Sequence, residues 1–135
     1  MKVVYPGSFN PWHDGHSDVL AKACDVFSHI VIAQGVNPVK QISERTRIPA
    51  AILAKFHPKV STAAFKGLFA DFIKGQDFCA VIKGLRNAQD LDYEKAQQYW
   101  NEDLGVLIPT FYVIADRKLT HISSSAIRAV EAFKK

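Results

Sequence analysis

The sequence has little of what marks several specialised protein classes. Only two of its 135 residues are cysteines, too few for a disulfide scaffold, and Cys24 and Cys79 both lie in apolar stretches, which favours two thiols over a disulfide. No apolar run approaches the ~18 residues of a membrane span. The apolar start of the chain is too short for a signal peptide. Repeats and low-complexity segments are also missing. We therefore expect a cytoplasmic protein.

What is present is an ordinary globular composition with a basic balance. Hydrophobic residues make up 48% and charged residues 22% of the chain, and 135 residues fit one domain over residues 1–135. Seventeen Lys and Arg against 13 Asp and Glu leave a net charge of +4. Such a balance is compatible with nucleic acid, an anionic membrane, a small anionic ligand or simply a solvated surface, so the placement of the basic residues must decide.

Short apolar runs alternate with amphipathic stretches along the whole chain. The runs predict strands at Lys2–Tyr5 (ended by Pro6-Gly7), Ile30–Ala33, Val60–Phe65, Phe78–Ile82 and Phe111–Ala115. Helices are expected at Asp14–Phe27, at Glu44–Phe56 with Ser43 as N-cap, from Leu68 to near Gly75, at Leu91–Leu104 capped by Asp90, and from Ser123 or Ser124 to Phe133. Five strands alternating with helices predict an α/β protein with a parallel sheet covered on both faces.

Ligands of such sheets bind beyond the carboxyl ends of the strands, and four expected strand exits are unusual in composition. The first, Tyr5–His16, runs from a strand into a helix. Gly7 allows close backbone approach and Ser8 offers a hydroxyl group. His13 and His16 flank a glycine at the helix start, where free N–H groups and the helix dipole favour an anion. This pattern predicts phosphate handling, although it is neither a P-loop nor a dinucleotide fingerprint.

The second exit is Lys83-Gly84-Leu85-Arg86, expected directly after a buried strand. Two cations beside a small residue suit two phosphate groups, with Arg86 as a bidentate donor and Lys83 as a point charge. Asp90, Asp92 and Glu94 follow. They fit a helix cap and a solvated helix face, and Glu94 could alternatively accept from ribose hydroxyls or orient Arg86.

Two further exits carry polar groups. Ser123, Ser124 and Ser125 stand together at an expected helix start, where one serine suffices for a cap and the others add donors suited to polyphosphate. Lys40 follows the strand at Ile30–Ala33, and its place at a strand exit is what makes it a candidate.

Together these segments resemble the nucleotidyltransferases that carry a (Thr/His)-x-Gly-His motif, and among them the phosphopantetheine adenylyltransferase family. Tyr5–Pro11 is similar to that family's Tyr-Pro-Gly-Ser/Thr-Phe-Asp-Pro. Lys83–Arg86 followed by Asp90–Glu94 is similar to its Arg-Gly-Leu-Arg and Asp-Phe/Leu-Glu/Asp-Tyr-Glu segments. Asn101 and the serine triplet complete the set in the family's order.

The resemblance implies a Rossmann-like fold and a reaction in which ATP and 4′-phosphopantetheine give dephospho-coenzyme A and pyrophosphate. It also implies Mg²⁺ bound mainly through the ATP phosphates, with no metal ligands from the protein. Dephospho-coenzyme A and coenzyme A become expected product or feedback ligands. A homo-oligomer, typically a hexamer in the family, is expected, and neither nucleic acid nor a membrane is an expected partner.

Site residues carry over position by position. His16, as transition-state stabiliser, Lys40 and Arg86 are the implied catalytic residues. The implied ATP-binding residues are Ser8, Phe9, His13, His16, Gly84, Leu85, Arg86, Glu94, Leu119, Ser123, Ser124 and Ser125. Those implied for phosphopantetheine are Ser8, Lys40, Phe69, Lys83 and Asn101.

The chain departs from the family pattern at three places. Lys83 stands where the family usually has Arg. His13 stands where the family usually has Thr and where related cytidylyltransferases have His. The chain also stops about ten residues after Ser125, whereas the family usually carries a further helical segment. The alternatives are a nicotinamide mononucleotide adenylyltransferase, a glycerol-phosphate cytidylyltransferase, or a non-catalytic nucleotide- or RNA-binding module.

Overall fold

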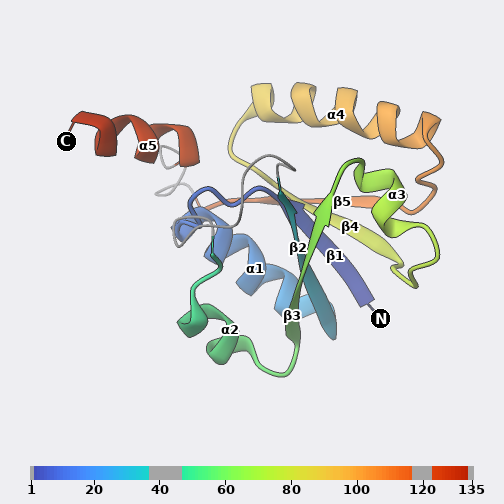
Figure 1. The fold of residues 1–135 in the computed structure, drawn as a ribbon, viewed down its shortest axis with the longest axis horizontal. Helices are drawn as coiled ribbons and strands as arrows, with labels where there is room; N and C mark the ends of the chain where they lie inside the picture. The colour runs from blue at the N-terminus through green and yellow to red at the C-terminus, as the bar shows by residue number, and fades with distance from the viewer. Residues whose placement is uncertain (1, 37–46, 117–122, 134–135) are drawn as a thin grey trace.

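The computed structural model describes residues 2–36, 47–116 and 123–133. These residues form a five-stranded parallel sheet in the order β3-β2-β1-β4-β5 (Figure 1). The strands are β1 (Lys2–Gly7), β2 (His29–Val36), β3 (Val60–Lys66), β4 (Ala80–Leu85) and β5 (Thr110–Ile114). The helices are α1 (Asp14–Val26), α2 (Ala50–Phe56), α3 (Phe69–Ile73), α4 (Ala88–Asp103) and α5 (Ser124–Phe133). The predicted Rossmann-like α/β fold is confirmed.

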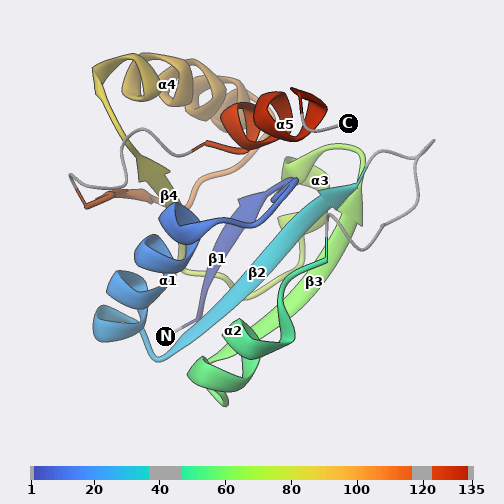
Figure 2. The same cartoon turned by 90° about the vertical axis from the view of Figure 1, so that its left-hand side faces the viewer.

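Helices cover both faces of the sheet (Figures 1 and 2). Val3 and Val4 are adjacent on β1 and both are fully buried, but they belong to different apolar clusters because successive strand residues point to opposite faces. The cluster around Val3 includes Leu20 of α1, and α2 packs at its margin. The cluster around Val4 is covered by α3, through side chains such as Phe72. The central strands of the sheet are therefore packed on both faces.

β4 begins and ends later than its apolar run indicates. The strand is Ala80–Leu85, so the prediction of Phe78–Ile82 is wrong at both ends. The ladder to β5 continues from Val81 through Lys83 to Leu85. A backbone ladder needs paired N–H and C=O groups rather than apolar side chains, so a lysine such as Lys83 can join it. Lys83 is thus part of the strand, not of the loop that follows.

β1 also outlasts its prediction, since it runs through Pro6 to Gly7. Pro6 is aligned with Ala33 of β2, whereas the pairing of β1 with β4 involves Val3 and Val4. Proline lacks an N–H group, and it is tolerated where the ladder does not need one on that side.

Two helix starts differ from the sequence expectation. α2 begins at Ala50, after the non-helical residues Arg47 to Pro49, because proline breaks the continuation of a helix from before it. Ser43, the predicted cap, lies outside the described residues. α4 begins at Ala88 with Asn87 as its N-cap, so the expected cap, Asp90, is instead a residue of the first turn.

Cys24 and Cys79 are both free, as predicted, although Cys79 is only partly buried. No helix within the described parts of the chain is long and apolar enough to cross a membrane.

Candidate active site

A cavity of about 330 Å³ lies at the carboxyl edge of the sheet. Its walls come from the ends of β1 and β4, the loop after β1, the first turn of α1, and the start of α5. The lining residues are Tyr5, Pro6, Gly7, Ser8, Phe9, His13, Gly15, His16, Val19, Lys83, Gly84, Leu85, Arg86, Glu94, Ala115, Ser123, Ser124 and Ser125. Segments far apart in sequence therefore meet at the edge where ligands of parallel sheets bind.

Most of the sequence-predicted site residues converge on this cavity. Phe69 and Asn101 instead line a second, smaller cavity of about 20 Å³. Lys83 and Glu94 line both cavities, so the two adjoin. Lys40 and Leu119 lie outside the described residues. The placement gives one large polar cavity and a narrow extension along α3 and α4.

His13 and His16 build the start of α1 as well as the cavity wall. His13 is the N-cap, and its Nδ1 accepts a hydrogen bond of 3.1 Å from the backbone N–H of Gly15. His16 Nδ1 accepts one of 3.1 Å from the backbone N–H of His13. Because Nδ1 is the acceptor in each neutral ring, the ring proton is on Nε2. Both histidines therefore present an Nε2–H donor away from the helix backbone.

Both rings are held in the neutral form. Burial, then the neighbouring His13 and Arg86, lower the pKa of His16 to about 3. Burial and Arg86 also lower the pKa of His13, against a smaller opposing effect of Asp14. A neutral imidazole near pH 7 is a hydrogen-bond donor to an oxyanion rather than a proton carrier, so the pair suits charge stabilisation.

Aromatic rings fix His16 in place. It stacks on His13 with ring centroids 3.7 Å apart, and Phe9 and Trp12 meet it at 4.9 and 5.2 Å. Phe9 is only 3% exposed and adopts a φ of 48°, in the left-handed region. Its ring occupies the space above Gly7, where an added Cβ would lie 2.8 Å from it. Phe9 thus borders the cavity mainly as packing behind the histidine.

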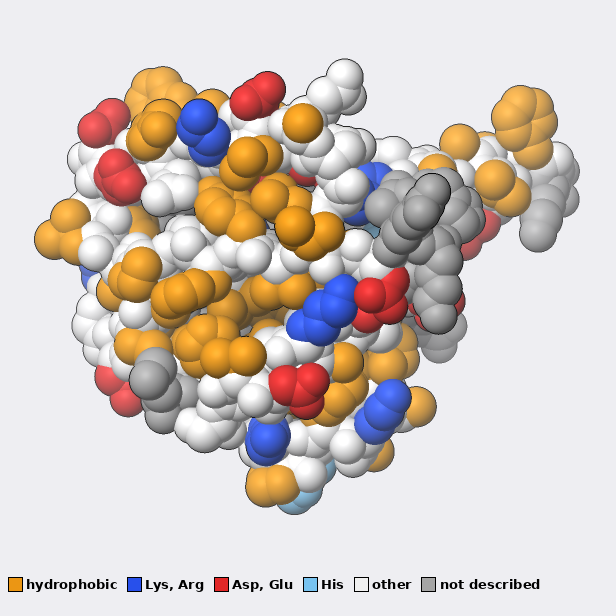
Figure 3. Space-filling model, turned by 180° about the vertical axis from the view of Figure 1, so that it is seen from behind, with side chains coloured by type: hydrophobic (Ala, Val, Ile, Leu, Met, Phe, Trp, Pro, Cys, Tyr) orange, Lys and Arg blue, Asp and Glu red, His pale blue; other side chains and the backbone are white. Residues whose placement is uncertain are grey.

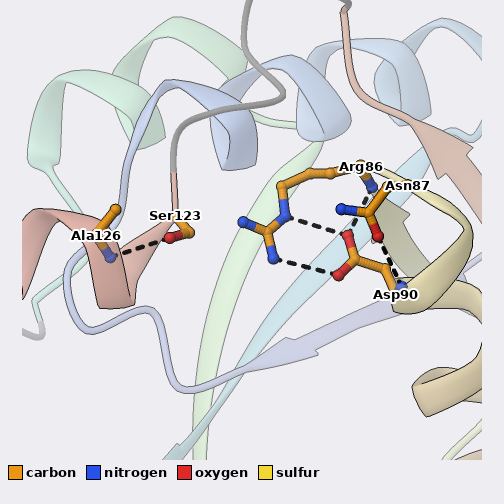
Figure 4. A network of polar contacts seen from close by, with 5 residues as sticks. All are labelled: Arg86, Asn87, Asp90, Ser123 and Ala126. Atoms are coloured by element: carbon orange, nitrogen blue, oxygen red, sulfur yellow. Dashed lines mark hydrogen bonds and ion pairs between the residues drawn. The ribbon is translucent and has the colours of Figure 1, made fainter.

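Arg86 is oriented by Asp90, the residue that the sequence assigned to the helix cap (Figure 4). Its Nε lies 3.1 Å from Asp90 Oδ2 and its Nη2 lies 3.2 Å from Oδ1. Asn87 provides the cap, because its Oδ1 accepts from the backbone N–H of Asp90 at 2.9 Å. The carboxylate of Asp90 therefore pairs with the guanidinium, and the amide side chain of Asn87 starts the helix.

Lys83 pairs with Glu94 across the boundary of the two cavities. The Nζ–Oε2 distance is 3.4 Å, and the side chains are 23% and 18% exposed. The ion pair holds the ammonium group of Lys83 toward Glu94, where the two cavities adjoin. The sequence left Glu94 two site roles, which were accepting from ribose hydroxyls and orienting Arg86. The geometry favours orientation of a cation, but that cation is Lys83.

The three serines have different hydrogen-bond partners. Ser123 Oγ accepts from the N–H of Ala126 at 3.0 Å, which makes it the cap of α5 and confirms that one serine has this role. Ser124 Oγ donates to the carbonyl of Pro11 at 2.9 Å. Ser125 Oγ accepts from Arg128 at 3.2 Å. The start of α5 is thereby tied to the loop after β1 across the cavity.

Comparison with known proteins places this geometry in a family. Residues 4–130 match the model of the cytidylyltransferase-like proteins. A phosphopantetheine adenylyltransferase of Clostridium tetani is 36% identical over 135 residues, which cover 97% of this chain and 84% of that protein. The chain belongs to the phosphopantetheine adenylyltransferase family.

A second relative and a solved structure also match most of the chain. The phosphopantetheine adenylyltransferase of Nautilia profundicola is 33% identical over 132 residues, or 96% of this chain and 86% of that protein. Among solved structures, the lipopolysaccharide core biosynthesis protein of Thermoplasma volcanium superposes with a TM-score of 0.52 over 86% of this chain and 98% of that one. At 17% identity this last likeness shows the shared fold alone.

Two residues of this adenylyltransferase-family site were missed by sequence reasoning. Gln34, at the end of β2, is 6% exposed, and its Nε2 donates to the carbonyl of Ser8 at 3.1 Å. Asp90 orients Arg86. Signals for both existed: an amide at the end of an apolar strand, and a carboxylate four residues after an arginine, which is helical spacing. Neither signal says which partner the tertiary fold supplies.

Partly buried contacts hold the exit of β5 against α1 in this adenylyltransferase-family chain. Asp18 of α1 accepts from the backbone N–H of Asp116 at 2.9 Å and pairs with Lys22 at 2.9 Å. Lys22 also donates to the carbonyl of Ile114 at 2.8 Å. The chain is thus fastened to α1 as it leaves β5.

The low pKa of His16 makes stability depend on pH. The unfolded ring binds a proton below about pH 6.5 and the folded ring resists it, so stability is complete above that pH and falls as the pH falls toward 3. Between pH 7 and pH 5 the free energy of unfolding should drop by about 2 kcal/mol more in the wild type than in His16→Asn, whose amide oxygen keeps the cap. Urea unfolding at both pH values measures this difference.

His57→Asn, at an exposed position, is the matched control and should follow the wild type. An unchanged pH dependence in His16→Asn would contradict the neutral, buried state of His16.

Proposed function

We propose that the chain transfers the adenylyl group of ATP to the phosphate of 4′-phosphopantetheine. A bond forms between an acceptor phosphate oxygen and the α-phosphorus, the bond from the α-phosphorus to the bridging oxygen breaks, and pyrophosphate leaves. The observation that carries this proposal is the cavity where two neutral imidazole donors, Lys83 and Arg86 converge, in a chain of the phosphopantetheine adenylyltransferase family. Residues 1–135 then act as one nucleotidyltransferase domain.

We assign the large cavity to ATP. The second cavity, beside Phe69 and Asn101, has only about 20 Å³, room for about one water molecule, so the pantetheine arm is expected to lie along the surface there rather than inside it. Lys83, which lines both cavities, then lies where the acceptor phosphate meets the α-phosphate. Lys40 is proposed as a second cation for that phosphate. The product dephospho-coenzyme A would span both regions, and coenzyme A shares most of its groups and is the expected feedback ligand.

The chemistry requires alignment and charge stabilisation rather than a side-chain nucleophile. The acceptor phosphate is itself anionic near neutral pH, so no strong general base is needed. His16 donates from Nε2 to the α-phosphate as negative charge develops there. Arg86 and the serines at the start of α5 hold the β- and γ-phosphates. The donor directions of His16 and Arg86 are fixed by the contacts described above.

The donor set of the cavity does not fit a protein-held metal. Among the described residues that line it, Glu94 is the one carboxylate, and it is paired with Lys83. Within the described residues, no three His, Cys, Asp or Glu side chains are grouped so that they could hold a metal ion. We propose that Mg²⁺ enters with ATP and is bound mainly through its phosphates, and no step above is assigned to it.

A pyrophosphate-release assay tests the proposed reaction. Purified protein is offered ATP or CTP with phosphopantetheine, nicotinamide mononucleotide or glycerol phosphate, and release is expected with ATP and phosphopantetheine. Release with another pair would favour that transferase instead. Binding of RNA in moderate salt with no release from any pair would favour the non-catalytic module.

Replacement of His16 should affect turnover far more than ATP binding. His16→Ala removes the Nε2–H donor to the transition state, and kcat is expected to fall by more than about tenfold, or ~1.4 kcal/mol, with a small change in ATP affinity. Steady-state kinetics and calorimetric titration with ATP measure the two effects. His57→Ala is the surface control. A fall below tenfold would exclude this role.

Lys83→Arg should be tolerated or beneficial. The guanidinium keeps the charge opposite Glu94 and adds a bidentate grip on the acceptor phosphate. Lys83→Met keeps the length without the charge, and it should raise the KM for phosphopantetheine. A large loss of turnover in Lys83→Arg would show that the ammonium group has a role of its own.

We also propose that the chain forms a homo-oligomer located in the cytoplasm. No residue of α4 is buried, and Trp100, Leu107 and Phe133 are 70%, 88% and 93% exposed. α5 projects from the body with hydrophobic side chains at its tip (Figure 3). Light scattering should give a multiple of the 15.0 kDa chain mass, and a monomer at micromolar concentration would contradict the assembly.

A further inference from the structure

One carboxylate holds both the backbone and the side chain of Arg86. Besides the two contacts with the guanidinium, Asp90 Oδ2 accepts from the backbone N–H of Arg86 at 2.9 Å. Asp90 is held in turn through its own N–H, which donates to Asn87 Oδ1. The side chains of Arg86 and Asp90 are 36% and 23% exposed. A loop residue is thus fixed at two points by the first turn of α4.

The pair also determines where the rest of the guanidinium points. Asp90 engages the edge formed by Nε and Nη2, and the group is planar, so the direction of Nη1 follows from that contact. The remaining nitrogen points toward Ser123, in the segment that precedes α5 (Figure 4). Arg86 and Ser123 both line the large cavity.

We propose that Asp90 is a positioning residue for the transfer reaction, which aims Arg86 across the cavity at the β- and γ-phosphates of ATP. This inference rests on the proposed function, because it assigns those phosphates to the space between Arg86 and the serines. Without Asp90 the Nε and Nη2 edge of the guanidinium loses the contacts that orient it, and the backbone N–H that leads into α4 loses its acceptor.

Loss of the Asp90 charge and loss of the Arg86 orientation would change the affinity for ATP in opposite directions. The variant Asp90→Asn can therefore distinguish the two roles. Asp90 offsets part of the positive charge of Arg86, so a role in charge balance alone predicts that Asp90→Asn binds ATP and pyrophosphate more tightly. A positioning role predicts weaker binding, because Asn keeps the shape but loses the ionic grip on the guanidinium.

The test compares Asp90→Asn with Asp92→Asn, which removes the same charge from an exposed site on the same helix. In Asp90→Asn we expect kcat/KM for ATP to fall at least tenfold, and the KM for pyrophosphate in the reverse reaction to rise similarly. The KM for phosphopantetheine should change less than twofold. A general structural fault would change all three parameters, and Asp92→Asn should change none.

A double-variant cycle shows whether Asp90 acts through Arg86. In the Arg86→Lys background, which has no fork to orient, the further change Asp90→Asn should have less than a twofold effect. A full tenfold effect in that background, equal values for Asp90→Asn and Asp92→Asn, or tighter ATP binding would each overturn the proposal.

Direct titration with ATP separates this proposal from the reaction. If the wild type releases no pyrophosphate, the proposed function fails, but weaker ATP binding by Asp90→Asn still supports the positioning role and unchanged binding overturns it. Should Asp90→Asn not fold, Asp90→Glu keeps the charge and moves the carboxylate by one methylene. It should weaken ATP and pyrophosphate in the same direction, and wild-type affinities in it would overturn the proposal.

Discussion

The capping of α1 by two histidines is the constraint on which the site depends. A helix start leaves backbone N–H groups without partners, and here the Nδ1 atoms of His13 and His16 accept two of the hydrogen bonds offered around it. The same contacts fix the tautomer of both rings and turn the Nε2–H groups outward. The capping of α1 and the orientation of the two Nε2–H donors are therefore coupled, because rotation of either ring would break a hydrogen bond at the helix start.

The rest of the fold places two cations and their carboxylate partners beside the two histidines. β4 lies beside β1, so the strand that carries Lys83 leads Arg86 to the cavity rim, close enough for its charge to lower the pKa of both histidines. The partners of the two cations come from α4, as Asp90 for Arg86 and Glu94 for Lys83. α4 has no buried residue, and its contribution to the site is electrostatic positioning more than packing.

The local patterns predicted most of the helices and strands, but they placed the ends of only some of them correctly. Periodicity placed α1 and α5 within a residue, because an amphipathic helix needs a regular apolar stripe. The ends of β4 were missed, because the ladder with β5 includes Lys83, whose side chain gives no apolar signal. The cap of α4 was missed because Asn87 and Asp90 are both good capping residues, and the presence of Arg86 beside Asp90 decides between them.

By itself the sequence determined which chemical groups the chain has at its strand exits, and these predicted a phosphate-handling protein, because the carboxyl ends of parallel strands share one edge. The nucleotidyltransferase class came from the resemblance of the combined motifs to a known family. Only the tertiary structure decided which groups orient which. The hydrogen bond from the buried Gln34 to Ser8 joins segments distant in sequence, and the low pKa of His16 arises mainly from burial. Such effects depend on distance and desolvation, which no local pattern records.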